Sequence, residues 1–449
     1  MIAMRDVGGG KVRTDVAVIF AASVPVGIAV LLRDSIVANR FGAGDLVDSL
    51  ALATAVSLFL VNLVGGAIGP ALIPLLAKLR QDGCADTALK LSGGAGLRLM
   101  LGMGGLALLL AVLAPALMAL LAPNFSETKR ELARHLLLAV LPVMFFGGVA
   151  TFLAALLQSR RRFLRVTLAQ IAVPLTVALA VWLLAAHLGI FVVVLGMGMG
   201  TLIQCGVLAF GLRDEARSLV PRWKAPEAEM RALWHQYAPM LLGTALMGST
   251  LLVTQVMAAW LDPGSVAALS FASVLVNYVV IAGIQMVGGP ALRHFSELTA
   301  RRDWQGSRRF LQYAVAGALI LGGIAAAAII FLSDRLVDLL FLHGAFTAID
   351  AQRVSRVQQL YALQLPWHIA GVIFSRLLSA MGMNHILLLG AALSLIFTVI
   401  LNYFLMHYLG VAGIALATSI TYFLAFIFLG AAAMLGMRRQ TALSQATGS

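Results

Sequence analysis

An arginine and an aspartate stand side by side in an otherwise apolar segment near the start of this chain. Arg33 and Asp34 follow VAVIFAASVPVGIAVLL, which begins at Val16. About 20 apolar residues cross a bilayer core of about 30 Å, so both charges are expected at membrane depth or near its far face. A guanidinium there suits an anionic group such as a diphosphate, with Asp34 holding the arginine or exchanging partners with it. The alternative is an ordinary ion pair that reaches toward the interface.

Two other charged residues have the same character. Arg376 lies near the middle of HIAGVIFSRLLSAMG, with no acidic residue within a helical turn. It either pairs with an acid on another helix or binds an anionic substrate, and we favour the substrate. Asp48 lies near the outer end of the second apolar segment. It is either a helix cap, which we favour, or a gate partner for Arg33. Arg33, Asp34, Asp48 and Arg376 form the candidate substrate-binding set.

The elements that position these residues must be membrane-spanning helices. The chain is 61% hydrophobic and 11% charged, with a mean hydropathy of +0.95, whereas a soluble domain carries about 25% charged residues. Apolar runs of 20 or more residues recur along its whole length, so we expect an all-α polytopic membrane protein with about twelve helices. They are predicted at 15–40, 46–77, 92–122, 132–158, 163–186, 188–212, 232–260, 265–292, 309–333, 354–382, 385–408 and 411–436.

The net charge of +13 is distributed as a topology signal. If the N-terminus is cytoplasmic, 22 of the 32 Lys and Arg residues fall on that side, so the positive-inside rule predicts both termini in the cytoplasm. These 22 cations lie at 5–13, 78–90, 160–165, 213–231, 293–309 and 438–439. The first apolar run reads as a span rather than a cleavable signal. Cys84 and Cys205 are expected to remain unlinked, because one lies in a loop and the other in a helix.

A weak internal repeat divides the chain into two halves. GPAL at 69–72 matches GPAL at 289–292, and Gly44 matches Gly264, at an offset of 220. Phe125 matches Phe346 at an offset of 221. An even number of spans separates the copies, so the repeat is parallel, a symmetry typical of transporters whose halves rock about a central cavity. We therefore expect lobes at 1–212 and 232–449, each with six helices, joined by the polar cytoplasmic linker 213–231.

Enzymatic signatures are not found in the sequence. There is no GxxxxGK[ST] loop and no HExxH motif, so we expect neither an enzyme nor an ATP-driven pump, and no metal or cofactor. The glycines at 196, 198 and 200 lie in an apolar helix, where close helix packing is the favoured interpretation.

Several segments resemble the MurJ (MviN) lipid II flippases of the multidrug/oligosaccharidyl-lipid/polysaccharide exporter superfamily. They are RDSIVANRFGAGDLVDSLALA at 33–53, GAIGPALIP at 66–74, APNF at 122–125 and LFLHGAFTAID at 340–350. The resemblance implies an alternating-access carrier of an undecaprenyl-diphosphate-linked glycan, with a cavity lined by helices one, two, seven and eight. It places Arg33, Asp34 and Asp48 on the family's polar positions and Arg376 where a basic residue is frequent.

The sequence also departs from the family pattern. Arginines that the family carries in helix two fall near Leu60 and Val61 here, and an Asp-Arg pair of helix eight falls on Ser273 and Val274. A family arginine in the first helix is replaced by Gly27. The cavity is thus expected to be less cationic, and the cargo is lipid II or a related cell-envelope precursor.

We predict a flippase of the bacterial inner membrane whose partners, besides the lipid-linked glycan, are membrane lipids and envelope-synthesis enzymes, and not nucleic acid. The alternatives are a cation-coupled exporter of small molecules from the same superfamily and a non-transporting membrane scaffold.

Overall fold

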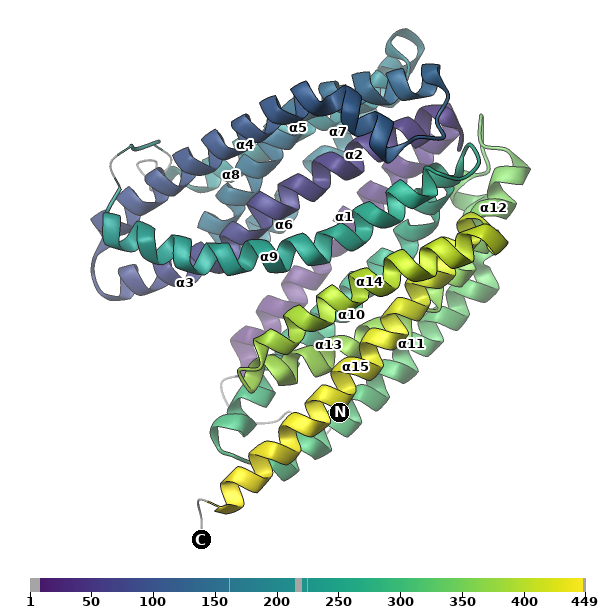
Figure 1. Cartoon of the computed structure of the whole chain (residues 1–449). Helices are drawn as coiled ribbons and strands as arrows, with labels where there is room; N and C mark the ends of the chain where they lie inside the picture. The colour runs from purple at the N-terminus through teal and green to yellow at the C-terminus, as the bar shows by residue number, and fades with distance from the viewer. Residues whose placement is uncertain (1–8, 161, 215–219, 224, 447–449) are drawn as a thin grey trace. The chain divides into compact units, whose positions relative to one another are not determined.

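The computed structural model describes residues 9–160, 162–214, 220–223 and 225–446, and within these ranges it consists of helices and short connections (Figure 1). No strand occurs in this part of the chain, which confirms the all-α class. The bounds are α1 Gly9–Phe41, α2 Asp45–Leu60, the π-helix η1 Val61–Gly65, α3 Gly66–Gln81, α4 Ala85–Leu121, α5 Glu127–Gln158, α6 Phe163–Ala169, α7 Ala172–Leu188, α8 Phe191–Gly211, α9 Glu227–Ala258, α10 Ser265–Ala300, α11 Trp304–Phe341, α12 Ala348–Ala362, α13 Leu365–Ala380, α14 Asn384–Leu409 and α15 Val411–Ala446.

Within the described residues, ten helical segments are long and apolar enough to cross a membrane. They coincide with ten of the expected helices, two of them composite, because α2, η1 and α3 run as one segment and α6 continues into α7. The other two expected helices are also present. The segment at 15–40 is α1, which carries Arg33, Asp34 and Arg40 in its second half. The segment at 354–382 is split into α12 and α13 just before Pro366, whose ring suits the first turn of a new helix.

The chain forms two compact units. The first runs to Gly264 and includes His343–Phe346, and the second comprises Ser265–Leu342 and the chain from Thr347 onward. Helix α9, expected in the second lobe, therefore belongs to the first compact unit. It packs along α2, η1 and α3, and the Tyr237 hydroxyl donates a hydrogen bond to the Val64 carbonyl at 2.8 Å. The division of the chain into two lobes of six helices each, joined by the linker 213–231, was inferred from the sequence repeat, and it stays a prediction.

Each unit has its own apolar core. In the first unit α5 is central and packs against α2, α4 and α8, with Leu52, Leu136 and Leu156 fully buried. In the second unit Phe295 of α10 and Leu377 of α13 are fully buried in a cluster that also includes residues of α11 and α15.

The glycine series confirms close packing at two of its three positions. A Cβ added at Gly196 would lie 2.7 Å from the Cα of Val177, and one at Gly200 would lie 2.6 Å from the Cα of Val173. Helices α7 and α8 therefore approach backbone to backbone there. Gly198 faces α5 instead, with only an ordinary contact to Val143 at 3.8 Å.

The predicted repeat positions occupy matching places in the two halves. Gly44 immediately precedes α2, and Gly264 immediately precedes α10. Phe125 and Phe346 are both buried, and each is followed by a helix N-cap. The caps are Ser126, whose hydroxyl accepts from the Lys129 amide, and Thr347, whose hydroxyl accepts from the Asp350 amide.

Four of the cations predicted on the inner side lie outside the described residues: Arg5, Arg161, Arg217 and Lys224. Residues 215–219 of the predicted linker also lie outside them. Arg162 is described, and its side chain caps the C-terminal end of α8. It donates hydrogen bonds to the Gly211 carbonyl at 2.7 Å and to the Asp214 carboxylate at 2.7 Å. The Arg162 hydrogen bond lowers the pKa of the Asp214 carboxyl below its usual value. Cys84 and Cys205 are free thiols, as expected.

Candidate functional site

Arg33 and Asp34 form an ion pair with each other on α1. The Arg33 Nε donates to Oδ1 of Asp34 at 2.8 Å, and a terminal nitrogen lies 2.6 Å from the same oxygen. The Asp34 side chain is 11% exposed and that of Arg33 is 29% exposed. The second carboxylate oxygen of Asp34 is buried and accepts no hydrogen bond from a described residue. Asp34 thus holds the arginine, as expected, and the pair keeps an unused acceptor. Its contact with substrate stays a prediction.

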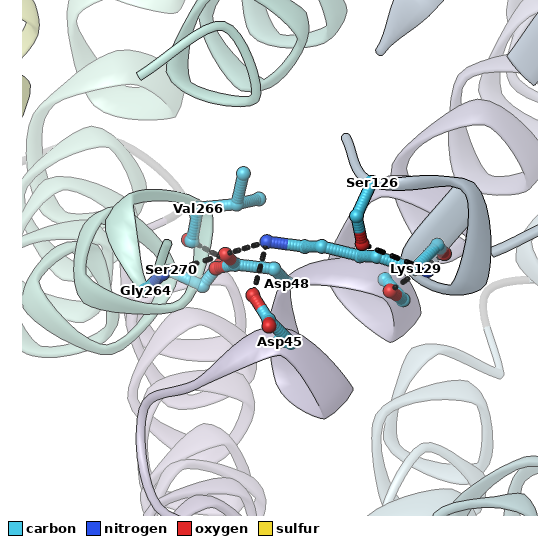
Figure 2. Close-up of polar contacts among 8 residues, drawn as sticks. Asp45, Asp48, Ser126, Lys129, Gly264, Val266 and Ser270 are labelled. Atoms are coloured by element: carbon cyan, nitrogen blue, oxygen red, sulfur yellow. Dashed lines mark hydrogen bonds and ion pairs between the residues drawn. The ribbon is translucent and has the colours of Figure 1, made fainter. Parts of the chain in front are cut away.

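Asp48 belongs to a buried charge cluster at the start of α2 (Figure 2). The Lys129 ammonium lies 2.7 Å from Oδ2 of Asp48 and 2.6 Å from Oδ1 of Asp45. Side-chain exposure is 1% for Asp48 and 7% for Lys129, against 56% for Asp45. The ammonium also lies 4.1 Å from the centroid of the Phe125 ring, a cation–π distance.

This geometry corrects the expectation that Asp48 is a helix cap. The N-cap of α2 is Gly44, with no side-chain cap bond, and Asp48 lies one turn further on. Its Oδ2 instead accepts from the Gly264 amide at 2.7 Å as well as from Lys129 (Figure 2). One carboxylate therefore ties together the start of α2, the start of α5 and the turn that ends at Gly264.

Lys129 and Asp45 were not among the residues predicted from the sequence to form a site. The available signal was the spacing of Asp45 and Asp48, since residues three apart share a helix face and two carboxylates there attract a cation. Nothing in the sequence placed Lys129 beside them, because 81 residues separate Asp48 from Lys129.

Arg376 lies on α13 in the second unit, beside α10. A Cβ added at Gly288 of α10 would lie 3.4 Å from its Nε and 3.4 Å from one terminal nitrogen, so the guanidinium rests against the glycine backbone. Its Nε is buried without a hydrogen-bond partner, and no described residue gives it an ion pair. A buried donor left unsatisfied costs about 1–3 kcal/mol. Arg376 therefore has no acidic partner among the described residues, whereas an anion would satisfy it.

The four candidate residues are divided between the two units. Arg33 and Asp34 form one pair, Asp48 belongs to the separate cluster around Lys129, and Arg376 lies in the second unit. A joint clasp by Arg33 and Arg376 stays a prediction.

Solved structures place this helical architecture in a known class. The chain matches the structure titled "Lipid II flippase MurJ, inward closed conformation" with a TM-score of 0.80 and 20% identity, covering 95% of this chain and 90% of that one. It matches an inward-facing multidrug resistance MATE family transporter of the MOP superfamily with a TM-score of 0.78 and 14% identity, covering 95% and 99%. The protein therefore has the two-lobed fold of MOP superfamily transporters.

Sequence comparison narrows the class. The family described as "Lipid II flippase MurJ" matches residues 37–447, nearly the whole chain. The probable lipid II flippase MurJ of Synechocystis sp. is 25% identical over 382 residues, which cover 78% of this chain and 68% of that protein. The corresponding protein of Haemophilus influenzae is 23% identical over 347 residues, covering 72% and 67%. This chain belongs to the MurJ family, which confirms the resemblance seen in its motifs.

Proposed function

We propose that this protein is an alternating-access flippase that moves a polyprenyl-diphosphate-linked saccharide, lipid II or a related envelope precursor, from the inner to the outer leaflet of the bacterial cytoplasmic membrane. The family match over 37–447 carries the proposal. The chemistry of the helices is consistent with it, because arginines at Arg33 and Arg376 retain donors suited to phosphate oxygens.

In this proposal the diphosphate is the part of the cargo that the arginines hold. Asp34 keeps Arg33 oriented while no substrate is present. Its second oxygen is available as an acceptor while Arg33 changes partner from Asp34 to the diphosphate. Arg376 receives the anion at a position where no acidic residue of the described ranges pairs with it. The saccharide headgroup crosses with the diphosphate while the polyprenyl tail stays in the lipid.

Two repeat-related loop contacts would close the outer end of this path. The Ala345 amide donates to the Asn39 carbonyl at 2.7 Å, and the Asn124 side chain donates to the Trp260 carbonyl at 2.7 Å. Ala345 and Asn124 are equivalent at the repeat offset of 221. The Trp260 indole also donates to the Leu121 carbonyl at 3.1 Å. Each half thus contributes one turn that contacts a segment of the other half, at the end of α1 in one case and at the turn after α9 in the other. The outer assignment of these contacts rests on the cytoplasmic termini that the positive-inside rule predicts.

The test is lipid II translocation by the purified full chain in proteoliposomes. Arg33→Ala and Arg376→Ala should each lower the flipping rate at least tenfold, measured as the fraction of fluorescent lipid II that a membrane-impermeant quencher reaches. Each removes a charge-assisted phosphate contact of about 1.5–3 kcal/mol. Arg40→Ala on α1 and Arg439→Ala on α15 are matched controls, since both arginines are exposed, and they should retain wild-type rates. Wild-type rates in both test variants would remove the phosphate assignment, and no flipping by the wild type would overturn the function.

A further inference from the structure

A cavity lies inside the first compact unit, separate from the four charged candidates. Its volume is about 510 Å³, and its walls come from α2, η1, α3, α5, α6, α7 and α8. This is within the usual range for sites that bind small molecules or headgroups. We infer that this cavity binds the uncharged saccharide part of the cargo headgroup, an inference that rests on the proposed flippase function and adds a sugar site to it.

The chemistry of the lining favours a neutral, hydroxyl-rich ligand. No Asp, Glu, Lys, Arg or His is among the described residues that line the cavity. Phosphate binding requires cations, so the diphosphate has no place there. The polar groups are instead four hydroxyls and four carboxamides. Such groups form hydrogen bonds in both directions with sugar hydroxyls.

The four hydroxyls have their protons already engaged. Thr54, Ser57, Thr151 and Thr201 each donate to the carbonyl four residues earlier in their own helix, at 2.7, 3.1, 2.9 and 2.8 Å. Their oxygens therefore face a ligand as acceptors. Acceptors of this kind suit the hydroxyl protons of a sugar.

The carboxamides supply the complementary donors. Asn62, Gln158, Gln170 and Gln204 line the same cavity and form no side-chain hydrogen bond with any described residue. Each carries two N–H donors and one carbonyl acceptor. In hydrocarbon such groups would be costly, so water or a hydrogen-bonding ligand must meet them.

Backbone features keep the cavity open. The π-helix η1 interrupts the α2–α3 segment beside it, and π-bulges are frequent at functional sites. A Cβ added at Gly66 would meet nothing within 4 Å, and one at Gly69 would first meet atoms at 3.9 Å. A larger side chain at Gly66 can therefore enter the cavity without displacing the protein.

The test compares lipid II with a lipid that carries the same polyprenyl diphosphate but neither sugar nor peptide. Purified full-length protein in detergent is titrated with lipid II and with undecaprenyl diphosphate. The wild type should bind lipid II more tightly. Gly66→Leu and the double variant Gln158→Leu/Gln204→Leu should weaken lipid II binding about tenfold, equivalent to about 1.4 kcal/mol, and leave undecaprenyl diphosphate binding unchanged.

Gly102→Leu is the matched control for Gly66→Leu, because Gly102 is exposed on α4 and a Cβ there also meets nothing within 4 Å. It should bind both lipids as the wild type does. Unchanged lipid II binding in the cavity variants, or equal weakening of both lipids, would overturn the sugar site while leaving the flippase proposal standing. Failure of the wild type to bind either lipid would overturn both.

Discussion

Lys129 shows how a buried charge in this protein depends on partners that are distant in the sequence. Its ammonium is shared by Asp45 and Asp48, and its side chain is almost fully buried. Arg376 represents the opposite case, since its Nε is buried without a described partner. The first arrangement suits a structural tie and the second suits a site that a ligand completes.

At the residue scale, Lys129→Met should be strongly destabilising. It leaves the Asp48 carboxylate buried without a counter-charge, and breaking a buried pair in this way costs about 3–5 kcal/mol. Asp48→Asn in the same background should recover part of that loss, whereas Asp45→Asn alone should change stability by less than about 1 kcal/mol, because Asp45 is more than half exposed. Thermal unfolding of the wild type, these three variants and Asp48→Asn alone, in one detergent, measures this. Additive effects of Lys129→Met and Asp48→Asn would show that the two charges are not coupled.

The element scale is governed by how closely the helices approach. Gly196 and Gly200 allow α7 and α8 to meet along their backbones, and the Thr176 hydroxyl reaches the Gly196 carbonyl at 2.9 Å across that contact. Small residues are the usual means of bringing membrane helices together, because lipid offers no hydrophobic drive for their association. The same region includes η1, which opens the α2–α3 segment beside the cavity of the first unit.

The corresponding prediction contrasts two glycines of one helix. Gly200→Ala should destabilise the protein by about 1–3 kcal/mol, because its methyl group would meet the Val173 Cα at 2.6 Å and force the helices apart. Gly198→Ala should be neutral or slightly stabilising, since its Cβ makes an ordinary contact at 3.8 Å and alanine favours the helix. Denaturation midpoints of the two variants check this. Equal midpoints would mean that the contact between α7 and α8 relaxes freely.

At the scale of the whole molecule, segments from both halves of the sequence meet inside the first compact unit through repeat-related contacts. The contact between Asn124 and Trp260 is the counterpart of that between Ala345 and Asn39. If these contacts close the outer end, as proposed above, alternating access requires them to part during each cycle, since a permanently closed outer end releases nothing.

A cross-link across this contact should therefore stop transport reversibly. In a background with Cys84 and Cys205 replaced by serine, Asn124→Cys/Trp260→Cys is linked with a short thiol-specific reagent, and flipping is measured before and after cleavage. Arg80→Cys/Ser159→Cys is the control, because these residues join α3 and α5 within one half through a 3.0 Å hydrogen bond. The control should flip normally when linked. Normal flipping by the linked test pair would show that the contact stays closed throughout transport.

The all-α class, the approximate spans and the repeat could be predicted from the sequence, because they depend on local properties. The apolar runs of bilayer length, the uneven distribution of cations and the motifs around GPAL and Phe125 can all be recognised in the sequence alone. The pairing of Arg33 with Asp34 was predictable for the same reason, since the two residues are adjacent.

Only the tertiary structure decided which distant groups meet. In the structure Asp48 forms an ion pair with Lys129 instead of capping α2, and α9 packs beside α2 and α3. Hydroxyls and carboxamides from several helices line one cavity. These features depend on which faces of the helices pack together. In an apolar chain most helix faces have a similar hydrophobicity, so periodicity does not distinguish a face that meets lipid from one that meets another helix.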